Sequence, residues 1–216
     1  MLTSKKHVFW QAFFLTVLFF LLGLSAGIYM EQLRSDKINL AFYNSEASLY
    51  DSFALGQLLK DSTASCGVLK SSSITFADKI YAEARELEKF DQSNQLTEST
   101  KIIHRKYDLL RTLLWMNVVD LKKRCEVNTV VYLYTYDTTE IRVKSKQVVW
   151  SRILSDLKTD QADKFILIPL AADQNITSLD YLVQKYNIKQ FPAVIINEKD
   201  VFYENEPAQK LAIYLK

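Results

Sequence analysis

One uncharged, strongly apolar segment near the amino terminus limits the fold more than any other feature of this chain. It runs from Val8 to Met30 and contains no Asp, Glu, Lys or Arg. About 20 apolar residues in a helix are enough to cross the hydrocarbon core of a bilayer. The segment therefore predicts a transmembrane helix, and a membrane is the first partner that we expect.

The residues on either side of this segment predict its orientation. Lys5 and Lys6 precede it, and the charges that follow it balance one another. Because positive residues tend to stay inside, we expect a cytoplasmic amino terminus and an extracytoplasmic remainder, in a single-pass protein of the cell membrane. A signal peptide also has a basic start, but its apolar core is usually only about 7 to 15 residues long. Cleavage near Ser25 is the alternative interpretation.

Gly23 and Gly27 stand four residues apart inside the apolar segment. This spacing permits two such helices to pack closely. A homodimer held through the two glycines is therefore a hypothesis that the sequence supports.

Composition and charge exclude several classes of protein. The chain has 27 basic and 25 acidic residues, and the two signs are interspersed, so that no basic face for nucleic acid is expected. Two histidines, His7 and His104, are too few for a metal site, which typically needs three or four ligands. We expect no metal and no cofactor, and we predict that His104 lies on an exposed helix surface.

Residues 31–126 predict a helical region between the membrane segment and a second domain. Apolar residues recur there at the spacing of a helix face, in three runs that contain no proline. A polar break at residues 91–95 predicts the exposed tip of a long antiparallel, coiled-coil-like pair. The runs contain Leu49, Phe53 and Gly56; Phe76, Ile80 and Ala84; and Ile103, Tyr107, Leu110, Leu114 and Val118.

From Val127 the pattern changes to alternating strands and helices. Strands are predicted at 130–135, 165–170, 193–197 and 201–204, and helices at 146–157, 178–186 and 207–215. This order predicts an α/β domain over residues 127–216.

The segment from Tyr186 to Asn197 reads as a helix end, a tight turn, a proline and a buried strand. Together with the element order, it resembles a thioredoxin-like domain that covers about residues 127–216. The resemblance implies a cis peptide bond before Pro192 and a Cys-x-x-Cys after the first strand. Tyr136-Asp137-Thr138-Thr139 stands there instead, so the catalytic dithiol is absent. The whole layout also resembles membrane-anchored thioredoxin-like proteins on the outer side of microbial membranes.

The predicted fold class is therefore α/β, with a thioredoxin-like domain preceded by a helical layer and an amino-terminal transmembrane helix over residues 1–30. At the carboxyl ends of its parallel strands we predict a peptide groove. Its residues are Tyr136, Asp137, Thr138, Phe191 and Pro192. A simple turn at residues 136–139 is one alternative. Another is Asp137 as an acid beside Thr138 as a nucleophile, for which the sequence offers no base.

Two cysteines, Cys66 and Cys125, flank the second and third helical runs. In an extracytoplasmic region they favour a disulfide, which would stabilise the fold by about 4 kcal/mol on the chain-entropy model. A redox pair and two separate buried thiols are the alternatives. Asn175, in the sequence Asn-Ile-Thr, is a candidate for N-glycosylation.

These features together predict a non-catalytic, membrane-tethered protein that acts as a protein-binding or chaperone-like module. One alternative is a thiol-disulfide oxidoreductase that uses Cys66 and Cys125. The other is a structural subunit of an envelope complex, held through the transmembrane glycines or the helical tip.

Overall fold

The computed structural model describes residues 5–58, 64–91 and 98–215. The chain divides into two compact units, residues 1–43 and 44–216. Helix α1 (Lys5–Leu58) begins in the first unit and ends in the second. Among the described residues it is the one helix long and apolar enough to cross a membrane, which confirms the predicted apolar helix at the amino terminus.

The second unit is built on a four-stranded mixed sheet. Its strands are β1 (Asn128–Tyr134), β2 (Phe165–Ala171), β3 (Ala193–Ile196) and β4 (Asp200–Phe202), in the order β2-β1-β3-β4. Strands β1 and β2 are parallel, whereas β3 is antiparallel to both β1 and β4. The mixed α/β class is thus confirmed, and β2 and β4 are the edge strands.

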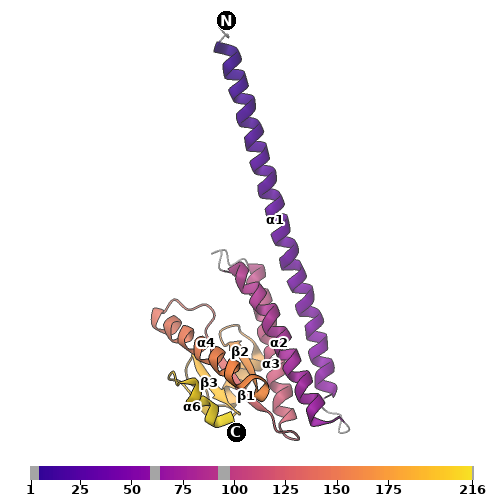
Figure 1. Ribbon diagram of the computed structural model, residues 1–216, viewed down its shortest axis with the longest axis vertical. Coiled ribbons are helices and arrows are strands. Elements are labelled where there is room, and N and C mark those ends of the chain that lie inside the picture. Colours follow the sequence, from indigo (N-terminus) through magenta and orange to yellow (C-terminus); the bar gives the residue numbers. More distant parts are fainter. Residues whose placement is uncertain (1–4, 59–63, 92–97, 216) are drawn as a thin grey trace. The chain divides into compact units, whose positions relative to one another are not determined.

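Helices cover both faces of this sheet (Figure 1). On one face, α4 (Ile141–Gln161) and α6 (Ala208–Ala212), which continues into a 3₁₀ turn at Ile213–Leu215, close a core around the fully buried Trp150 and Phe165. On the other side of the sheet, α3 (Glu98–Leu121) contacts β2 and α5 (Thr177–Lys185). The sheet therefore lies between two helical layers.

Helix α2 (Cys66–Asp91) packs along α3 and also contacts β2 at the edge of the sheet. The last turns of α1 join this pair, with Ser45, Ser48 and Ser52 buried. The three predicted helices are present, but the first buries small residues, and Phe53, predicted on its buried face, is 54% exposed. That assignment was wrong because the buried face of α1 runs through Ser48, Ser52 and Leu55, and Phe53 lies off this face. The predicted tip, from Asp91 onward, lies almost entirely outside the described residues.

A disulfide joins the start of α2 to the segment that precedes β1. The Cα atoms of Cys66 and Cys125 lie 5.5 Å apart, within the range for a bridge. The structure thus pairs the two cysteines as the sequence analysis predicts, and it connects the helical layer to the sheet.

Candidate functional site

The loop after β1 is fixed by side-chain contacts. The backbone N–H groups of Tyr136 and Asp137 donate to the carboxylate of Asp173, at 2.8 and 2.9 Å. The Thr138 hydroxyl accepts a hydrogen bond from the backbone N–H of Glu140, just before α4 begins. These contacts form a turn. They also occupy two of the backbone N–H groups with which the predicted groove would bind a peptide.

Pro192 lies at the same end of the sheet as this loop. The Phe191–Pro192 peptide bond is cis, as the resemblance implies, and Pro192 is buried. Ala193, the first residue of β3, pairs with Leu133 near the end of β1. Pro192 therefore lies beside the end of β1, where the loop at residues 136–139 begins. The structure thus places the five groove residues at one end of the sheet, and the groove itself stays a prediction.

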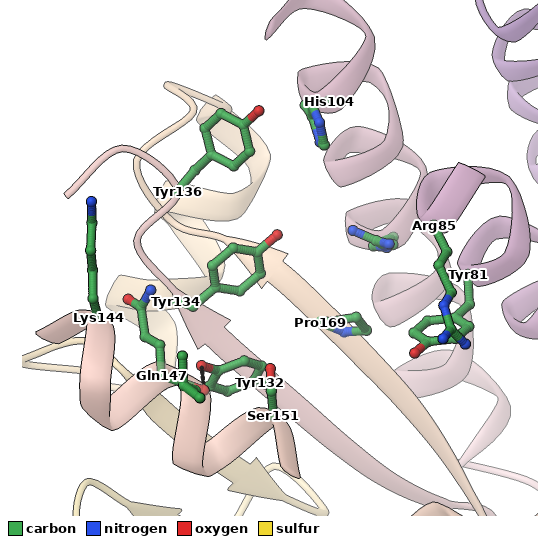
Figure 2. A pocket seen from close by; sticks show the side chains of 12 residues that line it. Tyr81, Arg85, His104, Tyr132, Tyr134, Tyr136, Lys144, Gln147, Ser151 and Pro169 are labelled. Atoms are coloured by element: carbon green, nitrogen blue, oxygen red, sulfur yellow. Dashed lines mark hydrogen bonds between the residues drawn. The ribbon is translucent and has the colours of Figure 1, made fainter. Parts of the chain in front are cut away.

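A cleft of about 530 Å³ lies beside this loop, between α4 and the pair α2 and α3. In Figure 2, Lys144 and Gln147 stand on one side, Tyr81 and Arg85 on the other, and Tyr134 and Pro169 between them. We call it the tyrosine cleft. Its lining residues are Tyr81, Arg85, His104, Arg111, Tyr132, Tyr134, Tyr136, Lys144, Gln147, Val148, Ser151 and Pro169.

A row of three tyrosines forms one side of the tyrosine cleft. Tyr132, Tyr134 and Tyr136 are alternate residues of β1 and its extension, so they share one face of the extended chain. The rings of Tyr132 and Tyr134 are stacked with centroids 5.5 Å apart. The Tyr132 hydroxyl donates to the backbone oxygen of Gln147, and burial raises the pKa of this phenol.

Gln147 fixes the position of α4 against this row. Its side-chain oxygen accepts from the backbone N–H of Thr135 at 3.0 Å, and its amide nitrogen donates to the Thr135 oxygen at 3.1 Å. Both backbone polar groups of Thr135, the N–H and the C=O, are thereby hydrogen-bonded. The wall of the cleft that carries Lys144 is therefore held rigidly to the end of β1.

The other charged side chains of the cleft are Arg85 and Arg111, and no carboxylate is among its described lining residues. Arg111 is buried and lies 3.3 Å from Asp108 Oδ1, which also accepts the backbone N–H of Ala171 at 3.2 Å. Burial raises the pKa of Asp108 to about 6, although Arg111 and the Ala171 amide both lower it. Asp108 therefore compensates Arg111 and ties α3 to the end of β2.

His104 is buried, with 6% of its surface exposed, so the prediction of an exposed helix position was wrong. Its ring contacts that of Tyr136, with centroids 4.7 Å apart, because the loop after β1 folds over α3. A sequence signal was present, since His104, Asp108 and Arg111 follow one another at the spacing of a single helix face. The loop that covers this face comes from a distant part of the chain.

The disulfide lies at the opposite end of β1 from the loop at residues 136–139. Cys125 precedes the strand and Tyr136 follows it, and seven extended residues span roughly 20 Å. The bridge is thus remote from the place where a thioredoxin-like dithiol would stand.

Asn175, the glycosylation candidate, is exposed in the turn before α5. Its φ is 53°, and its backbone oxygen accepts a hydrogen bond from Arg105 at 2.8 Å. The exposure makes the side chain accessible, and modification stays a prediction. No group of three or more His, Cys, Asp or Glu that could hold a metal occurs among the residues described.

Comparisons of the chain with protein-family models, with curated proteins and with solved structures give no match.

Proposed function

We propose that this protein is a membrane-anchored, extracytoplasmic protein-binding module whose domain at residues 127–216 is thioredoxin-like and performs no dithiol chemistry. The order β-α-β-α-β-β-α supports the fold, with β1 and β2 parallel and β3 and β4 antiparallel. The cis bond before Pro192, at the start of β3, supports it as well.

The position of the disulfide carries the non-catalytic part of this proposal. Both cysteines are in one bridge at the far end of β1, and the loop that would hold a dithiol contains none. Cys125 is buried and Cys66 is exposed, so the bridge is open to an attacking thiol on one side only. The bridge therefore serves as a staple between α2 and the sheet.

The tyrosine cleft supports a binding role. Tyrosine and arginine are the residue types that contribute most to protein interfaces, because they combine large contact areas with polar groups. The cleft gathers four tyrosines and two arginines beside the predicted peptide groove. A partner that binds at this end of the sheet meets both surfaces.

A second role, as a subunit that assembles within the membrane, is favoured by one observation. Gly23 and Gly27 stand four residues apart on the exposed apolar part of α1, a spacing that permits two such helices to pack closely. In this proposal, one protein assembles through the two glycines and binds its partner with the domain at residues 127–216.

An exchange assay on the full chain in detergent tests the absence of dithiol chemistry. We expect insulin reduction by dithiothreitol to proceed at the rate without protein, and the Cys66→Ser/Cys125→Ser variant to give the same rate. Acceleration that the double variant loses would establish the oxidoreductase alternative.

Photo-crosslinking in cells tests the binding role. A photoreactive residue in place of the exposed Asp137 should give a discrete crosslinked protein. The same residue in place of Gln209, exposed on α6, is the control and should give none. Absence of any product at position 137 would contradict a partner at this end of the sheet.

A further inference from the structure

We propose that the tyrosine cleft binds an acidic segment of a partner protein, with its carboxylates placed on Arg85 and Lys144. This inference rests on the proposed binding function and specifies where the partner binds and by what chemistry.

Charge is the first argument. Arg85 on α2 and Lys144 on α4 are exposed on opposite walls, and neither has an acidic partner among the side chains that the structure describes. Arg111, deeper in the cleft, is already compensated by Asp108. A ligand that enters between the walls therefore meets two cations, and the guanidinium of Arg85 matches the fork geometry of a carboxylate.

The aromatic row is the second argument. Tyr134 is half-buried and lies between the two cations, and Tyr81 is 48% exposed beside Arg85, so both cations have apolar ring surface near them (Figure 2). Phenol hydroxyls can donate to carboxylates while the rings contact apolar side chains. The cleft is thus suited to a ligand in which acidic and apolar groups alternate.

Size and arrangement favour a peptide segment over a single anion. The volume of about 530 Å³ lies within the usual range of ligand sites, about 300 to 1,000 Å³. Cations on opposite walls, with rings between them, offer several points of contact in succession. An extended chain with spaced carboxylates can use all of them at once, whereas one lipid headgroup would occupy one wall.

The test uses the full chain in phosphatidylcholine nanodiscs and a phage library of random nonapeptides. We expect the selected peptides to be enriched in Asp and Glu next to aromatic or aliphatic residues. The most enriched peptide, labelled with fluorescein, is then titrated by fluorescence anisotropy at two salt concentrations. Its affinity should fall at the higher salt, because the contacts are partly exposed ion pairs.

Variants locate the binding. Arg85→Gln and Lys144→Gln should each weaken the peptide about threefold, and the double variant about tenfold, as expected for exposed charge pairs. Arg152→Gln is the matched control, because Arg152 is an exposed cation of α4 outside the cleft lining. The affinity of this variant for the peptide should be unchanged. Thermal unfolding of each variant verifies that the fold is retained.

Several outcomes would overturn the inference. Selected peptides without acidic enrichment would do so, as would unchanged affinity in the Arg85→Gln/Lys144→Gln variant. Failure to select acidic peptides, with binding to phosphatidylglycerol vesicles that the double variant loses, would assign the cleft to lipid. If instead Phe191→Ala abolishes peptide binding and the cleft variants do not, the partner binds in the groove at Pro192, and the proposed binding function stands without this inference.

Discussion

At the scale of single residues, Glu198 has a backbone conformation that its contacts explain. It occupies the tight turn between β3 and β4 with φ of 57°, where glycine is usually found. Its carboxylate accepts hydrogen bonds from Trp115 Nε1 at 3.1 Å and from the Thr129 hydroxyl at 2.6 Å, and it pairs with Lys122. The turn is thereby attached to α3 and β1, and three donors offset the unfavourable φ.

Replacing Glu198 by Ala should lower the free energy of unfolding by about 2 to 3 kcal/mol, because partly buried donors lose their acceptor. Glu204→Ala is the matched control, since Glu204 pairs with Lys146 at the surface and is 80% exposed in its side chain. Little change is expected there. Urea unfolding followed by circular dichroism measures both variants, and equal effects would refute the role assigned to Glu198.

Asp108 should make the stability depend on pH. Its pKa of about 6 in the folded state lies above its ordinary value of 3.8, so the folded chain holds the proton more tightly than the unfolded chain. This contribution is fully present below pH 4 and is lost as the pH rises through about 6.

The Asp108→Asn variant removes that titration. The stability of the unaltered protein relative to this variant should therefore be greater at pH 4 than at pH 7, as measured by urea unfolding at both pH values. A difference between the two proteins that does not change with pH would show that folding leaves the pKa of Asp108 unchanged.

At the scale of elements, periodicity predicted which helices and strands exist, and packing decided their extents and faces. The four strands follow from runs rich in apolar and β-branched residues, whose burial in β1 and β3 is complete at Val130 and Ile195. Helix α4 begins at Ile141, five residues before the predicted start, because its first turns are mostly exposed and carry no apolar pattern. Periodicity detects only the face that is buried.

The tyrosine cleft could not be predicted in the same way. The alternation of Tyr132, Tyr134 and Tyr136 is visible in the sequence and places the three on one face. Arg85 and Lys144, however, come from different helices, and only the tertiary fold brings them to the cleft beside the three tyrosines. A site assembled from several elements has no local signal, whereas the loop and Pro192 were found because each follows or precedes a recognisable strand.

The end of α1 provides a prediction about close helix packing. A Cβ atom at Gly56 would lie 2.8 Å from Asn117 Oδ1, and the Asn117 amide donates to the Ser52 oxygen at 3.3 Å. Gly56→Ala should displace the Asn117 side chain, and the loss of its hydrogen bond, about 1 kcal/mol, should offset the gain in helix propensity, so that the free energy of unfolding changes little. Gly67, near the start of α2, has open space around it, so Gly67→Ala should stabilise the protein slightly.

Thermal unfolding of the two alanine variants tests this expectation. Gly67→Ala should raise the melting temperature more than Gly56→Ala does, since both substitutions favour helix and only Gly56→Ala meets a neighbour. Equal shifts would mean that Gly56 does not meet Asn117 of α3 as described.

At the scale of the whole molecule, a long apolar helix at the amino terminus leads into a stapled helical layer that packs on a mixed sheet, and the proposed binding surfaces lie at one end of that sheet. The disulfide links the start of α2 to the segment before β1 across 59 residues of sequence. On the chain-entropy model such a loop contributes about 4 kcal/mol, which is an upper value. The bridge is also the feature that separates a binding module from an oxidoreductase.

Removing the bridge should weaken the fold without affecting the ligand surface directly. The Cys66→Ser/Cys125→Ser variant should unfold at lower urea concentration than the oxidised protein, and the unaltered protein should match the variant once fully reduced. An unchanged midpoint would contradict a stabilising role for the staple.

The redox state of Cys66 and Cys125 in protein isolated from its native membrane tests the central claim most directly. Mass spectrometry with alkylation before and after mild reduction measures it. The account predicts a single bridge between the two residues that mild reductant leaves intact. Free thiols would contradict the structural staple and the proposed extracytoplasmic position of the domain, whereas a bridge that opens and reforms readily would contradict the proposed absence of dithiol chemistry.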